Sequence, residues 1–117
     1  MRNSQIMELS FKFSLKAIDL YKDLTEKREY IISKQLLRCS TSIGANVFEA
    51  SAAASRKDFV HKMTIASKEA RETYYWLKLL EKSRLVACEI EVHIKDLKDI
   101  MNILTAIVKT TKFNLNK

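Results

Sequence analysis

The chain has 117 residues, of which 47% are hydrophobic and 30% are charged, and it contains one glycine and no proline. This composition excludes a disordered chain, and the scarcity of turn-forming residues favours a few long helices in one domain over a sheet. Lysine and arginine outnumber the acidic residues 21 to 14, for a formal net charge of +7. Such an excess fits nucleic acid as a partner first and a membrane surface second, with charge that serves only solubility as the alternative.

The cysteines and the chain start bear on the cellular compartment. Cys39 and Cys88 lack the paired spacing of a zinc site or a redox motif, so we expect two free structural thiols. Residues 1–16 hold no continuous apolar segment, and no apolar run approaches the ~20 residues of a membrane span. The sequence therefore predicts a cytoplasmic protein without a signal peptide or a membrane segment.

The first half of the chain predicts two helices. In the first, residues 9–27, apolar residues recur every three or four positions, although a strict alternation from Leu9 to Ala17 also fits a strand. The helical spacing continues to Leu24, so length decides for a helix. The second predicted helix, residues 30–54, has a core stripe of mostly small side chains: Leu36, Ser40, Ile43, Val47, Ala50 and Ala54.

The second half predicts two more helices, residues 56–82 and 89–111. Ser55 and Asp58 resemble a capping box, so a very short turn is expected before the third helix. The tail, residues 109–117, is expected to fray. The stripe of the third helix is Phe59, Met63, Ala66, Ala70, Thr73, Leu77 and Leu80, and that of the fourth is Ile90, Ile94, Leu97, Met101, Leu104 and Val108. Four amphipathic helices with short connections predict an all-α, antiparallel up-down four-helix bundle.

The sequence carries no recognisable catalytic or metal-binding motif. It lacks the Glu-x-x-His pairs of a di-iron bundle, a Gly-x-Ser-x-Gly nucleophile elbow and a glycine-rich phosphate loop. Glu89 and His93 are four residues apart, but two ligands do not make a metal site. His61 is expected to face solvent and Cys39 to be packed in a helix. We therefore expect no enzyme activity, no metal and no cofactor.

A basic stripe runs along the predicted third helix, on the side opposite its core, and continues on the fourth. On the third helix it extends about 38 Å, close to one turn of duplex DNA, and it includes Tyr75, which can stack on a base or a ribose. The alternative is an ordinary solvated lysine face, and Asp96 and Asp99 dilute the stripe on the fourth helix. The candidate nucleic-acid-binding residues are Lys57, Lys68, Arg71, Tyr75, Lys78, Lys82, Lys95 and Lys98.

A second apolar surface on the third helix predicts a second packing partner. Ile65, Trp76 and Leu79 lie off its core stripe, so they contact either a neighbouring helix or another subunit. Trp76 is the expected anchor of a subunit interface, with a peripheral core position as the alternative. Gly44 lies on one flank of the second helix, and the sequence leaves open which flank faces the third helix. The candidate interface residues are Gly44, Ile65, Trp76 and Leu79.

The middle of the chain resembles a known family. The segments "QLLRCSTSIGANVFEA" and "SRKDFVHKMTIASKEARETYYWLKLL" are similar to bacterial four-helix-bundle proteins encoded in intervening sequences of large-subunit ribosomal RNA genes. The resemblance is dense from Gln35 to Leu80, with departures at Ser40 and Phe48. It implies a homopentamer, and a relation to the accessory variability proteins of diversity-generating retroelements, which are basic pentamers that bind a reverse transcriptase and nucleic acid.

Together, the resemblance and the basic stripe lead to a functional hypothesis. The protein is expected to be a non-enzymatic oligomeric scaffold that binds RNA or DNA through basic helix faces. The alternative is a protein–protein adaptor whose basic charge is incidental.

Overall fold

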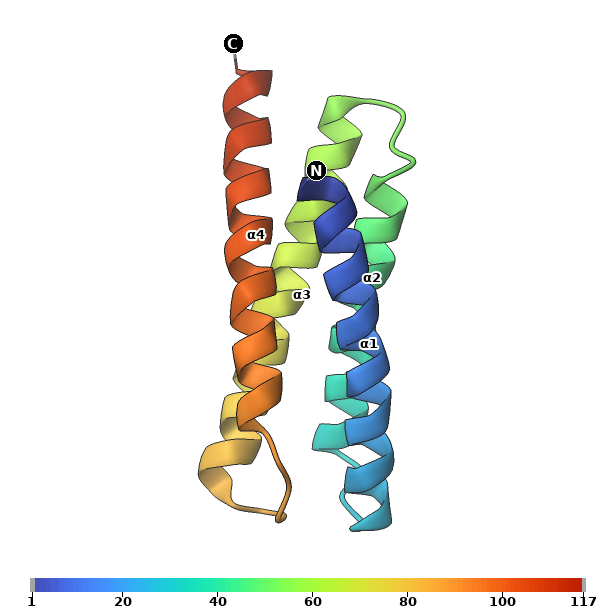
Figure 1. Cartoon of the computed structure of the whole chain (residues 1–117), viewed down its shortest axis with the longest axis vertical. Helices are drawn as coiled ribbons and strands as arrows, with labels where there is room; N and C mark the ends of the chain where they lie inside the picture. The colour runs from blue at the N-terminus through green and yellow to red at the C-terminus, as the bar shows by residue number, and fades with distance from the viewer. Residues whose placement is uncertain (1, 117) are drawn as a thin grey trace.

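The computed structural model describes residues 2–116, which form four helices that run alternately down and up (Figure 1). α1 and α3 each pack against both α2 and α4, so the helices follow one another around the bundle in chain order. The bundle measures 50 × 22 × 22 Å. The helices are α1 (Arg2–Glu26), α2 (Ile32–Ala50), α3 (Arg56–Ser83) and α4 (Glu91–Leu115). The prediction of an all-α, four-helix fold is confirmed.

The core is formed by one apolar stripe from each helix. Complete burial of each large aliphatic side chain contributes roughly 1.5–3 kcal/mol to folding. The largest side chains with no more than 1% exposure are Ile6, Leu24, Ile43, Met63, Leu77, Leu80, Leu97, Ile100 and Leu104. No helix in the described part of the chain is both long enough and apolar enough to cross a membrane.

The predicted stripes of α2 and α3 are largely confirmed, and the stripe of α4 is wider than predicted. Ala54 lies beyond the end of α2 and is exposed. In α4, Ile100 and Ile107 are buried, although the predicted stripe omits them. The predicted Met101 and Val108 are only partly buried. A helix that packs against two neighbours buries a broad apolar surface, and a single line of residues spaced by three and four captures only part of it.

Three predicted helix limits are wrong. α1 begins at Arg2 and not at residue 9, because Ile6 and Ser10 continue its buried stripe. α2 ends at Ala50, and the Ser51 hydroxyl donates a hydrogen bond to the Phe48 carbonyl at 2.6 Å. The connection to α3 is therefore longer than the very short turn expected. The tail expected to fray is helical to Leu115.

The start of α2 is capped by a side chain that the sequence analysis did not identify. Arg28 adopts a left-handed conformation with φ of 65°, which turns the chain so that the buried Glu29 carboxylate faces the helix. The backbone N–H groups of Ile31 and Ile32 each donate to Glu29 Oε2 at 3.0 Å, and that of Ser33 donates to Oε1 at 2.6 Å. One carboxylate thus satisfies three donors that a helix N-terminus leaves unpaired.

The start of α3 has the cap that the sequence predicts. Ser55 Oγ accepts a hydrogen bond from the Asp58 backbone N–H at 3.1 Å. At the other end, α3 stops at Arg84, which is left-handed with φ of 53°. Lys27, after the end of α1, donates to the carbonyl of Ala87 in the connection to α4 and so ties the two lower loops of Figure 1 together.

Candidate nucleic-acid interface

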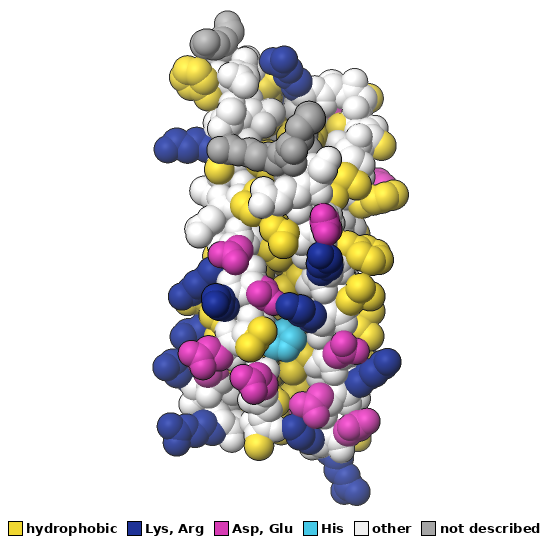
Figure 2. Space-filling model, in the orientation of Figure 1, with side chains coloured by type: hydrophobic (Ala, Val, Ile, Leu, Met, Phe, Trp, Pro, Cys, Tyr) yellow, Lys and Arg dark blue, Asp and Glu magenta, His cyan; other side chains and the backbone are white. Residues whose placement is uncertain are grey.

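All eight candidate nucleic-acid-binding residues lie at the surface of two adjacent helices. Seven are exposed and Lys78 is partly exposed. Lysine and arginine side chains line the edge of the molecule on the α4 side, whereas hydrophobic side chains gather on the opposite, α1 side (Figure 2). Six of the eight come from α3 and two from α4, and these helices pack directly against each other. We call this set the α3/α4 face: Lys57, Lys68, Arg71, Tyr75, Lys78, Lys82, Lys95 and Lys98.

Most cations of the α3/α4 face have no acidic partner. Within the described residues only Lys78 is paired, through a 3.1 Å contact between its Nζ and Glu81 Oε1. The hydrogen bond to Glu81 raises the pKa of the Lys78 ammonium. The five other lysines and Arg71 form no ion pair in this part of the chain, so their charges are available to phosphate groups.

One acidic residue expected to dilute the basic stripe lies elsewhere. Lys16 of α1 donates to Asp96 Oδ2 at 2.6 Å. Asp96 is therefore on the side of α4 that faces α1, and the expectation that it weakens the stripe is wrong. Asp99 is exposed, as expected.

Tyr75 is held in place by a chain of contacts that reaches α2. Its ring lies edge-to-face with that of Trp76, with the ring centroids 5.3 Å apart and the planes at 76°. Trp76 Nε1–H donates to Glu72 Oε2 at 3.0 Å, and Glu72 in turn accepts from Arg38 of α2. Arg38 also lies 3.5 Å from Glu69 Oε2. The role of Arg38 could not be read from the sequence, because its acidic partners are more than thirty residues away along the chain.

The second apolar surface of α3 faces a neighbouring helix. Trp76 packs partly buried against the core, and its bond to Glu72 places it on the flank that meets α2. Ile65 is partly buried, and the helix period puts it on this same flank. Leu79 is partly turned outward and exposed. A role for these residues in a subunit interface stays a prediction.

Gly44 lies on the flank of α2 that faces α1, a point that the sequence left open. A Cβ atom at this position would lie 3.1 Å from Ser14 Oγ and 3.3 Å from the carbonyl oxygen of Ser10. Glycine therefore allows the two helix backbones to approach closely. The other flank of α2, which carries Arg38, faces α3.

An apolar groove runs beside Gly44 between α1 and α2. Phe11 and Phe48 rise on its two sides and are 65% and 66% exposed, and Leu15 and Ile18 continue the apolar surface along α1. We call these four residues the α1/α2 face. The exposure of Phe11 and Leu15 explains the strand-like alternation in the sequence of α1: apolar residues lie on its outer side as well as on its core side.

The remaining reactive side chains in the described part of the chain are the two cysteines and the two histidines. Burial raises the pKa of the Cys39 and Cys88 thiols, which favours their neutral, unreactive form. His61 is exposed, and burial lowers the pKa of His93. Among residues 2–116, no three His, Cys, Asp or Glu side chains are placed to share a metal ion.

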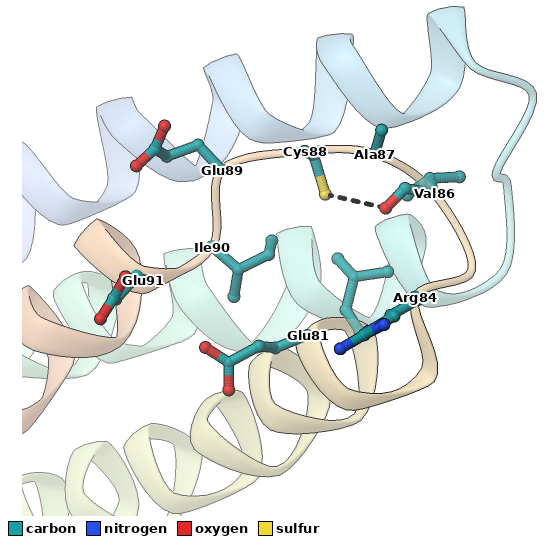
Figure 3. Close-up of a pocket in the computed structure, with 9 residues that line it drawn as sticks. Glu81, Arg84, Val86, Ala87, Cys88, Glu89, Ile90 and Glu91 are labelled. Atoms are coloured by element: carbon teal, nitrogen blue, oxygen red, sulfur yellow. Dashed lines mark hydrogen bonds between the residues drawn. The ribbon is translucent and has the colours of Figure 1, made fainter.

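Reactive side chains also line a hollow beside the connection from α3 to α4 (Figure 3). Cys88 Sγ lies 3.9 Å from the Val86 carbonyl oxygen, and Ile90 points into the hollow. The carboxylates of Glu89 and Glu91 point away from it. Glu81 and Arg84 line it from the C-terminal end of α3, and no group of three possible metal ligands lies here among the described residues.

Comparisons with known proteins identify the family. Residues 2–106 match the family model described as 23S rRNA-intervening sequence protein. The chain belongs to this family. A crystal structure of a protein with unknown function from the S23 ribosomal protein family of Bacteroides thetaiotaomicron is 42% identical, with a TM-score of 0.88. The similarity covers 93% of this chain and 99% of that one. No curated protein matches the chain.

Family membership confirms the resemblance to the intervening-sequence proteins, whereas the relation to the accessory variability proteins and the homopentamer stay predictions. It supports the four-helix architecture but supplies no activity, because the similar structure is itself described as a protein with unknown function. Function in this member of the intervening-sequence family is therefore to be sought in its own surfaces.

Proposed function

We propose that this protein is a non-enzymatic oligomeric scaffold that binds RNA or DNA through the α3/α4 face. The observation that supports this best is the collection of unpaired cations on one side of the bundle. Lys57, Lys68, Arg71 and Lys82 project from the same side of α3, and Lys95 and Lys98 join them from α4. Such an array attracts a phosphate backbone and releases its condensed counterions.

The salt dependence of binding tests this proposal. A site that neutralises about five phosphates gives a slope of log K against log salt of about −4.5 for a duplex and about −3.5 for a single strand. Fluorescence anisotropy with labelled oligonucleotides between 50 and 300 mM KCl measures this slope. Absence of binding at 50 mM KCl, or an affinity that does not change with salt, would overturn the proposal.

A pair of charge-reversed variants locates the binding surface. Lys68→Glu combined with Arg71→Glu should weaken binding to all sequences alike and reduce the salt slope. Lys22→Glu combined with Lys34→Glu provides the control, since both of these lysines are exposed on α1 and α2 and the double variant has the same net charge. Equal losses in the two double variants would assign binding to net charge and not to the α3/α4 face.

The oligomeric part of the proposal is supported by the α1/α2 face. Monomeric soluble proteins rarely expose large contiguous apolar patches, and such patches mark interaction sites. We propose that this face contacts another copy of the chain in the homopentamer that the family resemblance implies. Light scattering at micromolar concentration tests the assembly, and a monomer would refute it.

The α1/α2 face also favours a second candidate function. If another protein covers it, such as the reverse transcriptase implied by the resemblance, the protein is an adaptor in the cytoplasm and its basic charge is incidental. That function predicts a protein partner that co-purifies and remains bound after nuclease treatment. Loss of the partner on nuclease treatment would instead support the nucleic-acid scaffold.

A further inference from the structure

Tyr75 is an exposed aromatic ring in the middle of a basic surface. Its side chain is 59% exposed, although it belongs to a long packed helix. Arg71 precedes it by one helical turn and Lys78 follows it by one turn, so their Cβ atoms lie about 5–6 Å from that of Tyr75. An aromatic ring beside a cation at this spacing is suited to a nucleotide, because the ring can stack on the base while Arg71, which has no ion pair among the described residues, contacts an adjoining phosphate.

The ring also contacts a neighbouring side chain that is itself linked to α2, which favours one orientation of the ring. Trp76 holds it edge-to-face at 5.3 Å, Glu72 holds the Trp76 indole at 3.0 Å, and Arg38 of α2 holds Glu72. A side chain that is already ordered loses less conformational entropy on binding. Three acidic groups of α3 already have cationic partners: Glu72 and Glu69 contact Arg38, and Glu81 contacts Lys78.

We infer that Tyr75 stacks on an unpaired base, so that the α3/α4 face binds single-stranded nucleic acid in preference to a duplex. This inference rests on the proposed function and narrows its ligand. Bases inside a duplex are already stacked on both sides, whereas an unpaired base offers a free face to an aromatic side chain. Stacking of this kind tolerates any sequence, because every base has such a face.

The test compares single strands with duplexes of the same length. Twelve-nucleotide oligouridine and oligothymidine, and twelve-base-pair RNA and DNA duplexes, are titrated at 50 mM KCl. Tyr75→Ala should weaken single-strand binding about 5- to 140-fold and change duplex binding less than about twofold. Tyr75→Phe should retain the wild-type affinity, since it keeps the ring. The RNA and DNA arms distinguish the two kinds of strand.

Two features of the chain sharpen this experiment. Tyr30→Ala is a matched control, because Tyr30 is 60% exposed but lies in the connection between α1 and α2. Trp76 is the only tryptophan, so its fluorescence reports directly on the neighbourhood of Tyr75. A single strand should change the emission of Trp76 in the wild type and change it less in Tyr75→Ala.

The outcomes separate this inference from the proposed function. If no oligonucleotide binds at 50 mM KCl, the proposed function fails and the inference fails with it. If single strands and duplexes bind alike, or if Tyr75→Ala binds single strands as the wild type does, the stacking inference is overturned while nucleic-acid binding stands. An equal loss in Tyr30→Ala and Tyr75→Ala also overturns it.

Discussion

The Glu29 cap is the local feature whose removal should have the clearest effect on stability. In Glu29→Ala, the N–H groups of Ile31, Ile32 and Ser33 lose their acceptor. Water can replace it at the exposed Ile31, but Ser33 is completely buried. Loss of a helix cap costs about 0.5–2 kcal/mol, and a buried donor without a partner costs about 1–3 kcal/mol. We expect a total loss of about 2–4 kcal/mol in the free energy of unfolding.

Thermal and urea denaturation followed by circular dichroism measure this loss. For a domain of this size, 1 kcal/mol corresponds to about 4 °C in Tm, so Glu29→Ala should melt about 8–16 °C below the wild type. Glu26→Ala is the control, since Glu26 is an exposed glutamate at the end of α1 and should change stability by less than about 0.5 kcal/mol. A Glu29→Ala variant as stable as Glu26→Ala would refute the capping role.

The same carboxylate predicts a pH dependence. Burial raises the pKa of Glu29, but the hydrogen bonds from Ile32, Ser33 and Ile31 outweigh it and hold the pKa below the ordinary value of 4.5. Because the folded pKa lies below the unfolded one, the stabilisation is fully present above pH 4.5 and is lost as the pH falls through the folded pKa. The stability difference between wild type and Glu29→Gln should therefore shrink in acid. A difference that grows below pH 4.5 would contradict this assignment.

Two further predictions concern the contact of α1 with α2. In urea denaturation, the free energy of unfolding of Gly44→Ala should stay within about 1 kcal/mol of the wild type, because the gain in helix propensity offsets the tight contact of the new Cβ atom. Gly44→Leu should lose at least about 2 kcal/mol, because the larger side chain pushes α1 away from α2. Glu49→Leu is the control, because it adds the same side chain at an exposed position of α2. A Gly44→Leu variant as stable as Glu49→Leu would show that the close approach of the two helices is not needed. Phe48→Glu should convert the oligomer to a monomer in light scattering while changing the free energy of unfolding by less than about 0.5 kcal/mol, because Phe48 is mostly exposed. An unchanged oligomer would exclude the α1/α2 face from the subunit contact.

The parts of the fold that follow from local periodicity could be predicted from the sequence. The stripe of α3 is regular, so its buried residues, and with them the outward position of Lys68 and Arg71, follow from the helix period alone. The cap at Ser55 was also predictable, since its donor lies only three residues away.

The contacts that were missed depend on tertiary structure or on unusual backbone conformations. The Glu29 cap needs the left-handed Arg28, a conformation that usually favours glycine or asparagine. Arg38 meets Glu72 only after α2 and α3 have packed together. The sequence leaves open which helix Gly44 faces, because α2 carries small residues on several sides. Periodicity distinguishes the buried side of α2 from its exposed side, but it does not distinguish the flank that faces α1 from the flank that faces α3.

The two surfaces of the bundle suggest how assembly and binding are compatible in one small domain. Since the helices follow chain order around the axis, the α1/α2 face and the α3/α4 face lie on opposite sides. In a closed ring the α1/α2 face of one copy docks on a different surface of the next copy. The proposed assembly leaves the cations of α3 and α4 accessible when that second surface is not the α3/α4 face. In the proposed assembly, each added copy would contribute another basic face to the same long strand, and linked sites can raise overall affinity by about 10²–10⁴ without new contacts. Phe48→Glu should consequently weaken binding to long single strands far more than binding to a twelve-nucleotide strand that one copy can hold. Equal losses of affinity for both lengths would show that assembly does not contribute to the binding of long strands.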